Sequence, residues 1–283
     1  MCLSQKTIQK EVEISGIGLF TGKKAHLRLV PGKVGTGIIF CRKDLPHQPL
    51  ISAIVSNVRK TPRCTTLHEN GEGATITMVE HLLSALKAYG IDNLRIELDG
   101  PEIPVGDGSA KVFVELIEKS GILLQPEEKK VYSLDRPIHF SEGDTHLVAL
   151  PSNEFKISYT LHYPHSTFLK SQYYSLSLNE GSFKEAISTC RTFSLYEEIA
   201  PLLEKGLLKN VGLENGVVIK GDGVMNPEGL RFPDEMVRHK ILDLIGDLSL
   251  VGCPFYAHIL SIRSGHSSNV SFASLLRDHF LKK

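Results

Sequence analysis

The chain has 283 residues, of which 41% are hydrophobic and 23% are charged, the proportions of an ordinary globular protein. Lysine plus arginine and aspartate plus glutamate both number 32, so the zero net charge excludes a general electrostatic attraction to nucleic acid or anionic membranes. The five cysteines are scattered and form no Cys-x-x-Cys pair. This pattern argues against a disulfide framework or a structural zinc knuckle and favours a reducing compartment.

The N-terminal residues contain no apolar core of signal-peptide length. No stretch approaches the roughly 20 apolar residues of a membrane-spanning helix. We therefore expect a cytoplasmic protein with no transmembrane segment and no nucleic-acid partner, and we expect a monomer.

The first half of the chain begins with short alternating runs separated by glycine and proline turns, which predict strands within residues 1–60. A helix, a strand and a second helix are then expected at residues 75–89, 93–99 and 110–120. The polar stretch at residues 125–130 contains a proline and is the predicted linker between two domains.

Alternation returns in the second half and predicts strands at residues 131–134, 146–150, 155–161 and 173–178. Two helices and a strand follow at residues 182–188, 197–206 and 216–220. A helix, a strand and a last helix are expected at residues 235–248, 258–262 and 267–281. Strand runs followed by helices therefore occur twice, which predicts an α+β fold with two similar halves.

The helix expected at residues 235–248 carries both an apolar face and a polar stripe. The stripe consists of His239, Asp243 and Asp247 at steps of four residues, which places neighbouring members on one side of the helix. An imidazole and a carboxylate arranged in this way can both reach one metal ion. The alternative is an ordinary solvated pair of a histidine and an acid.

A short sequence echo suggests where a third ligand lies. Met-Val-Glu-His, ending at His81, resembles Met-Val-Arg-His, ending at His239. If the two halves arose by duplication, both histidines face one cleft between them. A catalytic zinc takes three protein ligands, and Glu80 beside His81 is placed to act as a general base. Alone, such a dipeptide is common in helices.

Further polar residues mark possible catalytic and binding positions. The Ser-Gly-His turn after a predicted strand presents His266, which Asp247 could orient and keep protonated. The other candidates are Thr192, Phe193, Lys240 and Arg263, of which the two cations could meet phosphate. The alternatives are an exposed turn histidine, a helix-terminal threonine, a core phenylalanine and solvated charges.

Several motifs occur in order along nearly the whole chain: Val-Glu-His-Leu at 79–82, Gly-Ile-Asp-Asn at 90–93, Pro-Glu-Ile-Pro at 101–104, Asp-Gly-Ser-Ala at 107–110, Arg-Thr-Phe at 191–193 and Ser-Gly-His at 264–266. They resemble the UDP-3-O-acyl-N-acetylglucosamine deacetylases, the zinc amidases of lipid A biosynthesis in Gram-negative bacteria. The longest and most specific match runs over residues 229–247.

The resemblance implies two similar two-layer α/β-sandwich domains packed helix face to helix face, with the active site in the interdomain cleft. The expected domains are residues 1–126 and 127–283, and the second contains an insert near residues 194–224 that forms the acyl-chain passage. The passage residues expected from this insert are Ile199, Leu202, Leu203, Leu207 and Val217. A small local core is the alternative for these apolar residues.

The resemblance also implies a metal centre. His81, His239 and Asp243 would bind zinc, and Glu80 would activate the water that attacks the acetamide. A site of two histidines and one aspartate with an open position also suits ferrous iron.

The remaining roles implied by the resemblance concern the oxyanion, the leaving group and the substrate. Zinc and the Thr192 hydroxyl would stabilise the oxyanion. His266, supported by Asp247, would protonate the leaving amine or assist the oxyanion electrostatically. Substrate contacts are expected from Lys240, which would meet the UDP phosphates, and from Phe193 and Arg263.

The expected reaction is zinc-dependent hydrolysis of the N-acetyl group of UDP-3-O-acyl-N-acetylglucosamine, the committed step of lipid A biosynthesis. Two alternatives are a zinc amidase that acts on another N-acetyl sugar and a non-catalytic protein that binds a nucleotide sugar or lipid. The chain departs from the family pattern at Phe20, where the family often has histidine, and at residues 61–64, where the family is more apolar.

Overall fold

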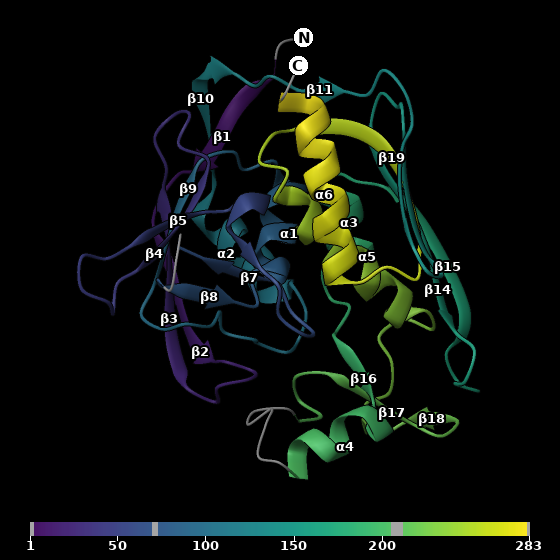
Figure 1. The fold of residues 1–283 in the computed structure, drawn as a ribbon. Helices are drawn as coiled ribbons and strands as arrows, with labels where there is room; N and C mark the ends of the chain where they lie inside the picture. The colour runs from purple at the N-terminus through teal and green to yellow at the C-terminus, as the bar shows by residue number, and fades with distance from the viewer. Residues whose placement is uncertain (1–2, 70–72, 205–211, 282–283) are drawn as a thin grey trace.

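The computed structural model describes residues 3–69, 73–204 and 212–281 and has the expected α+β fold (Figure 1). The first half contains β1 (Ser4–Ile8), β2 (Val12–Ile17), β3 (Lys24–Pro31), β4 (Ile38–Arg42), β5 (Leu50–Ser52), the 3-10 helix η1 (Val55–Asn57), β6 (Val58–Arg59), β7 (Thr66–His68), β8 (Thr75–Thr77), α1 (Glu80–Tyr89), β9 (Leu94–Leu98), α2 (Lys111–Ser120) and β10 (Ile122–Glu128).

The second half contains β11 (Tyr132–Ser133), β12 (Ile138–Glu142), β13 (Thr145–Leu150), β14 (Phe155–Tyr163), β15 (Lys170–Ser177), α3 (Glu180–Ala186), β16 (Phe193–Leu195), α4 (Tyr196–Glu204), β17 (Val217–Lys220), β18 (Gly223–Val224), α5 (Glu235–Ser249), β19 (Phe255–Ile262) and α6 (His266–Leu281). None of the helices in the described ranges has the length and apolar character needed to cross a membrane.

The two halves repeat one sheet topology. The first main sheet has the strand order β2-β3-β9-β4-β5, and the second has β12-β13-β19-β14-β15, with β11 added beside β19. In each of these five-strand orders, the central strand, which comes last along the chain, pairs in parallel with one neighbour. These parallel pairs are β9 with β4 and β19 with β14. The short strand β11 also pairs with β19 in parallel, and the other neighbouring pairs are antiparallel. In this repeat α1 and α5 hold the same position, as the sequence echo at His81 and His239 predicts.

The two helices lie in the middle of the molecule, with one main sheet on each side (Figure 1). Alternation explains the sheets: in β3, buried Ala25, Leu27 and Leu29 point to the core while the residues between them are partly exposed. Helix α5 packs against α1, α6, β14 and β15, so its polar stripe is buried together with its apolar residues. His239 and Asp243 are therefore not the solvated pair that the sequence left as the alternative.

A glycine allows α1 and α5 to approach closely. A Cβ atom placed on Gly246 of α5 would lie 2.1 Å from the backbone oxygen of Glu80, at the start of α1. No side chain fits at this distance. The lack of a side chain at Gly246 therefore allows the first turn of α1 to pack against the last turn of α5.

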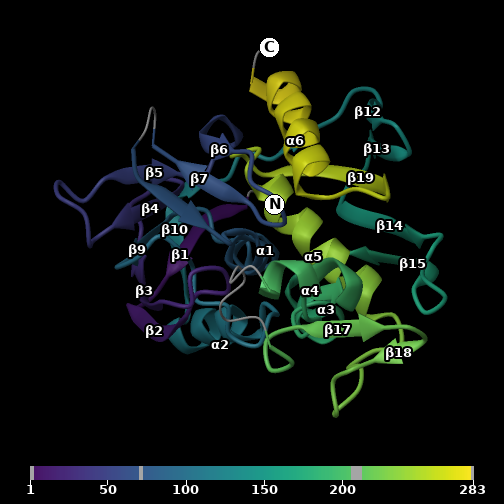
Figure 2. The same cartoon turned by 60° about the horizontal axis from the view of Figure 1, so that its bottom comes forward.

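Each half also has additional elements between the fourth strand of its main sheet and its central helix, that is, between β5 and α1 in the first half and between β15 and α5 in the second. The first half inserts the small sheet β6-β7-β8, and the second inserts α3, α4 and the sheet β16-β17-β18. Helix α4, β17 and β18 lie at one end of the molecule, which faces the viewer in Figure 2.

Three sequence-based expectations were wrong in detail. The helix expected at residues 75–89 begins at Glu80, because Thr75–Thr77 forms β8 and Met78 has a positive φ of 63°. Most of the expected linker at 125–130 belongs to β10, which pairs with β1 as far as Glu128. His266 is the first residue of α6, whereas the sequence placed it in a turn. The domain boundary at residue 126 stays a prediction.

We expect Gly246→Ala to destabilise the protein. Alanine is a better helix former than glycine by about 1 kcal/mol, but overpacking a core costs about 1–3 kcal/mol. The added Cβ atom would lie 2.1 Å from a backbone oxygen, so we expect a cost at the upper end of that range. Denaturant unfolding measures the difference. Gly223→Ala is the control, because a Cβ there meets nothing within 4 Å. Equal unfolding midpoints for the two variants would contradict the close approach.

Candidate active site

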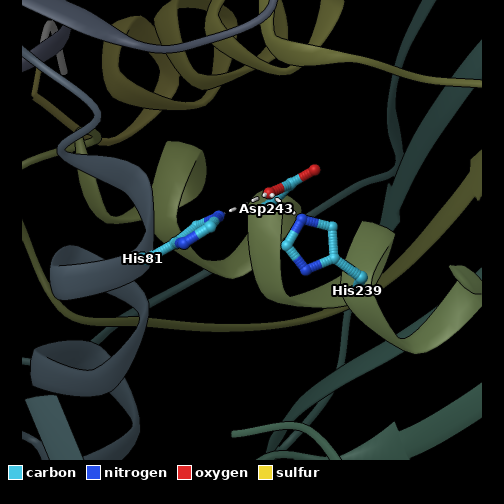
Figure 3. A group of neighbouring side chains, drawn as sticks. All are labelled: His81, His239 and Asp243. Atoms are coloured by element: carbon cyan, nitrogen blue, oxygen red, sulfur yellow. Dashed lines mark ion pairs between the residues drawn. The ribbon is translucent and has the colours of Figure 1, made fainter. Parts of the chain in front are cut away.

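Two helices bring together the three predicted metal ligands (Figure 3). His81 lies in the first turn of α1, and His239 and Asp243 lie one turn apart on α5. The Nε2 atom of His81 lies 3.5 Å from Asp243 Oδ1, and the Nε2 atom of His239 lies 3.3 Å from the same oxygen. The three side chains are buried, and their candidate ligand atoms lie within 4.8 Å of one another. One ion could therefore contact all three.

The hydrogen bonds of this cluster fit a metal site. Asp243 Oδ1 is buried without a hydrogen-bond partner, although it faces two imidazole nitrogens. His239 Nδ1 lies 3.0 Å from the Cys190 carbonyl oxygen, an acceptor that places the proton on Nδ1 and leaves the Nε2 lone pair free. Burial lowers the pKa of His239 to about 4, so its imidazole is neutral, as ligation requires. Two imidazoles and one carboxylate form a ligand set that zinc commonly uses.

The second oxygen of the aspartate has its own partner. The Lys240 ammonium donates to Asp243 Oδ2 at 2.9 Å. Burial alone would raise the pKa of Asp243, but the neighbouring positive charges, among them Lys240, hold it well below its usual value. The ligand is therefore ionised, and its two oxygens have different tasks.

Glu80 precedes His81 and is almost completely buried. Burial raises the pKa of this carboxyl above its ordinary value. Its Oε2 accepts a hydrogen bond from the Thr65 backbone N–H at 3.1 Å, and its Oε1 lies 3.8 Å from His266 Nε2. A carboxylate with a raised pKa, held beside the ligand cluster, is suited to accept a proton from water.

His266 faces Glu80 and is held from behind by Asp247. Its Nδ1 lies 2.9 Å from Asp247 Oδ2, which also accepts from Asn269 Nδ2 at 2.9 Å. Burial alone would lower the pKa of His266, but Asp247, Asp243 and Glu80 outweigh it and raise the pKa to about 10. The imidazolium therefore keeps its proton at neutral pH and can act as an acid.

A cavity of about 250 Å³ opens over these groups. It is lined by site residues from both halves: Glu80, His81, Thr192, Phe193, Lys240, Asp243 and His266. The Lys240 ammonium lies 5.5 Å from the centre of the Phe193 ring, and the ring centroid of Phe193 lies 6.4 Å from that of His239. The predicted acid, the predicted base, the Thr192 hydroxyl and two of the three predicted ligands, His81 and Asp243, therefore share one cavity.

The remaining wall of the cavity is partly apolar. Leu19 and Phe20 come from the turn after β2, and Ile199, Val217 and Val218 come from the second insert. An ion pair crosses between these walls, because the Arg63 guanidinium lies 3.1 Å from the Glu198 carboxylate of α4. Phe20 and Arg63, two residues at which the chain departs from the family pattern, thus border the cavity.

Some predicted residues lie elsewhere or cannot be placed. Arg263 is not among the lining residues, and its guanidinium pairs with Asp144 at 3.1 Å. Leu202 and Leu203 belong to α4, but their side chains are outside the described part of the structure, and Leu207 lies outside the described residues.

Sequence reasoning missed two groups that hold the site. Arg191 is buried, and its Nε donates to Glu235 Oε1 at 2.9 Å, which ties the segment of Thr192 and Phe193 to the start of α5. Arg191 and Glu235 both lie within motifs that match the family, but the motifs do not predict that the two side chains pair. Thr65, which contacts Glu80 and Asp247, had no signal in the sequence.

The chain is similar to known proteins over nearly its whole length. Residues 5–278 match the family described as UDP-3-O-acyl N-acetylglycosamine deacetylase. A UDP-3-O-acyl-N-acetylglucosamine deacetylase of Chlamydia pneumoniae is 50% identical over 270 residues, 95% of each chain. Proteins of the same name from Chlamydia abortus and Chlamydia trachomatis serovar L2 are 49% and 48% identical, over 95% and 96% of this chain and 95% and 94% of the relatives.

We expect the purified protein to contain about one divalent metal ion per chain. His239→Ala should abolish stoichiometric binding, because it removes a buried ligand, whereas His258→Ala should retain the metal, since His258 bonds to Ser158 in the sheet. Elemental analysis measures the metal content. Chelation should also lower the melting temperature, because the metal binds the folded state. Equal metal contents in the two variants would exclude the proposed ligand set.

Proposed function

Since the chain belongs to the UDP-3-O-acyl N-acetylglycosamine deacetylase family, we propose that it hydrolyses the acetamide of UDP-3-O-acyl-N-acetylglucosamine, releasing acetate and the free amine. The observation that carries this proposal is that the cluster of three candidate ligands lies together with a carboxylate base and an imidazolium acid beside one cavity. The proposal includes a cytoplasmic, monomeric enzyme, which cell fractionation and the solution mass of the purified chain test.

His81, His239 and Asp243 would hold a zinc ion, and ferrous iron is the other metal that suits this ligand set. When bound, the metal supplies Lewis-acid chemistry, which lowers the pKa of a water molecule and polarises the amide carbonyl. Lys240 leaves Asp243 Oδ1 free for ligation because it occupies Oδ2.

The chain's own residues would move two protons. Glu80 accepts a proton from the attacking water as the water oxygen bonds to the acetamide carbon. His266 donates its Nε2 proton to the amide nitrogen when the carbon–nitrogen bond breaks, so the amine leaves uncharged and acetate is the second product. The Thr192 hydroxyl borders the same cavity and can donate to the oxyanion between these two steps.

Two further features of the cavity suit the rest of the substrate. Lys240 presents a positive charge beside the Phe193 ring, which fits the diphosphate and an adjacent ring of a nucleotide sugar. Ile199 and Val217 provide an apolar wall for the acyl chain. This wall favours an acylated sugar over other N-acetyl sugars. Arg263 has no part in the proposal, because it pairs with Asp144 outside the cavity.

Glu80→Gln and His266→Ala should each lower kcat by about 10²–10⁴-fold, because each removes one proton transfer. Both variants should keep the metal, since neither is a ligand. Deacetylase assays with elemental analysis measure the two properties together. Glu115→Gln on the exposed face of α2 is the control and should retain full activity. Full turnover in Glu80→Gln would remove Glu80 from the role of base.

Shortening the acyl chain should lower kcat/KM about fourfold per methylene removed from the cavity, because each buried methylene contributes about 0.8 kcal/mol. Ile199→Ala should weaken this dependence. Ile262→Ala, an exposed position on β19, should leave it unchanged. The measurement compares substrates with a series of chain lengths and one with no acyl group. Equal kcat/KM with and without the chain would favour another N-acetyl sugar as the substrate.

A further inference from the structure

We propose that Thr65 is a positioning residue that holds the base and the acid of the reaction in register, an inference that rests on the proposed deacetylase function. Thr65 lies between β6 and β7 in the insert of the first half, far in sequence from Asp247 and His266. It is buried, and it is not among the residues that line the cavity. It therefore acts through other side chains and not on the substrate.

Thr65 contacts all three residues of the proton-transfer machinery. Its backbone N–H donates to Glu80 Oε2 at 3.1 Å. Its hydroxyl donates to Asp247 Oδ1 at 2.6 Å, a short distance typical of a hydrogen bond to a charged carboxylate. The same Oγ1 lies 3.3 Å from His266 Nδ1. The base and the acid are thus linked through a single residue.

The hydroxyl has one proton, and this determines the direction of each bond. Because that proton goes to Asp247, Oγ1 can only accept from His266 Nδ1–H, which donates chiefly to Asp247 Oδ2 at 2.9 Å. Asp247 Oδ2 and Thr65 Oγ1 are both acceptors for His266 Nδ1, so they favour a proton on this nitrogen. The opposite nitrogen, Nε2, is the one directed toward Glu80 and the cavity.

Thr65 is the hydrogen-bond donor to one of the two carboxylate oxygens of Asp247. Oδ2 accepts from His266 and Asn269, whereas Oδ1 has Thr65 as its donor within the described ranges. Without the hydroxyl, a buried carboxylate oxygen would lack its donor, and the carboxylate could rotate away from His266. Loss of the Thr65 hydroxyl would therefore disturb the orientation of the His266 imidazole, although Thr65 does not contact the substrate.

The backbone on both sides keeps Thr65 in place. Its carbonyl oxygen accepts from the Val79 N–H at 3.4 Å, and the next residue begins β7, which pairs with β8. After β8 the chain turns into α1 through Met78, whose φ of 63° is unfavourable for a residue with a side chain. The β7–β8 hairpin and this turn therefore fix Thr65 relative to Glu80.

Thr65→Val tests the proposal because it keeps the shape and the backbone N–H but removes the hydroxyl. We expect kcat to fall about 10- to 100-fold, as for other residues that orient catalytic groups, with KM and metal content unchanged. Thr65→Ser should restore kcat. Thr66→Val is the matched control, since Thr66 is equally buried and its hydroxyl bonds to Thr61 without contacting the acid or the base. Thr65→Ala replaces Thr65→Val if the valine variant does not fold.

A second measurement does not require activity. The His266 Nδ1–H proton, assigned by its absence in His266→Ala, should give a downfield resonance that shifts or broadens in Thr65→Val and persists in Thr66→Val. Thr65→Val that matches Thr66→Val in both kcat and this resonance would overturn the proposal. If the wild-type protein does not deacetylate the sugar nucleotide, the proposed function fails, and the resonance alone decides the role of Thr65.

Discussion

The close contact between α1 and α5 is the constraint on which the site depends. Gly246 allows the α5 backbone to approach Glu80, and this approach brings His81 of one half within 3.5 Å of Asp243 of the other. Neither helix alone provides three ligands. Because the contact is between backbones, a small displacement of either helix would move the base and one ligand together, away from the remaining ligands.

Charge is the second constraint. The buried carboxyl groups of Glu80, Asp243 and Asp247 face two partly buried cations, Lys240 and His266. Burying charges is costly unless they are paired and hydrogen bonded. The ionised cluster has one more negative charge than positive charges, and the unpaired oxygen, Asp243 Oδ1, lies between the two imidazoles. A divalent cation at that position would offset the excess and favour the ionised form of Glu80.

The repeated topology explains how the site is divided between the halves. In each half the extra elements follow the fourth strand and precede the central helix. The first insert provides Thr65, which holds Glu80 and Asp247, and the second provides Phe193 and the apolar wall around Ile199. The duplicated frame thus supplies the helices, and the two different inserts supply positioning and substrate shape.

The sequence by itself determined what is local. The spacing of His239, Asp243 and Asp247 fixed their common side of α5, because neighbours four residues apart on a helix lie together. The helix wrongly extended to residue 75 shows the limit of periodicity, since Thr75–Thr77 is a strand whose β-branched residues were the better signal. The sequence echo and the family resemblance also grouped His81 with this helix. Only the tertiary structure buried the polar stripe, placed Thr65 behind the acid and the base, and excluded Arg263 from the cavity. These contacts join residues far apart in the chain, and they depend on how the two halves pack.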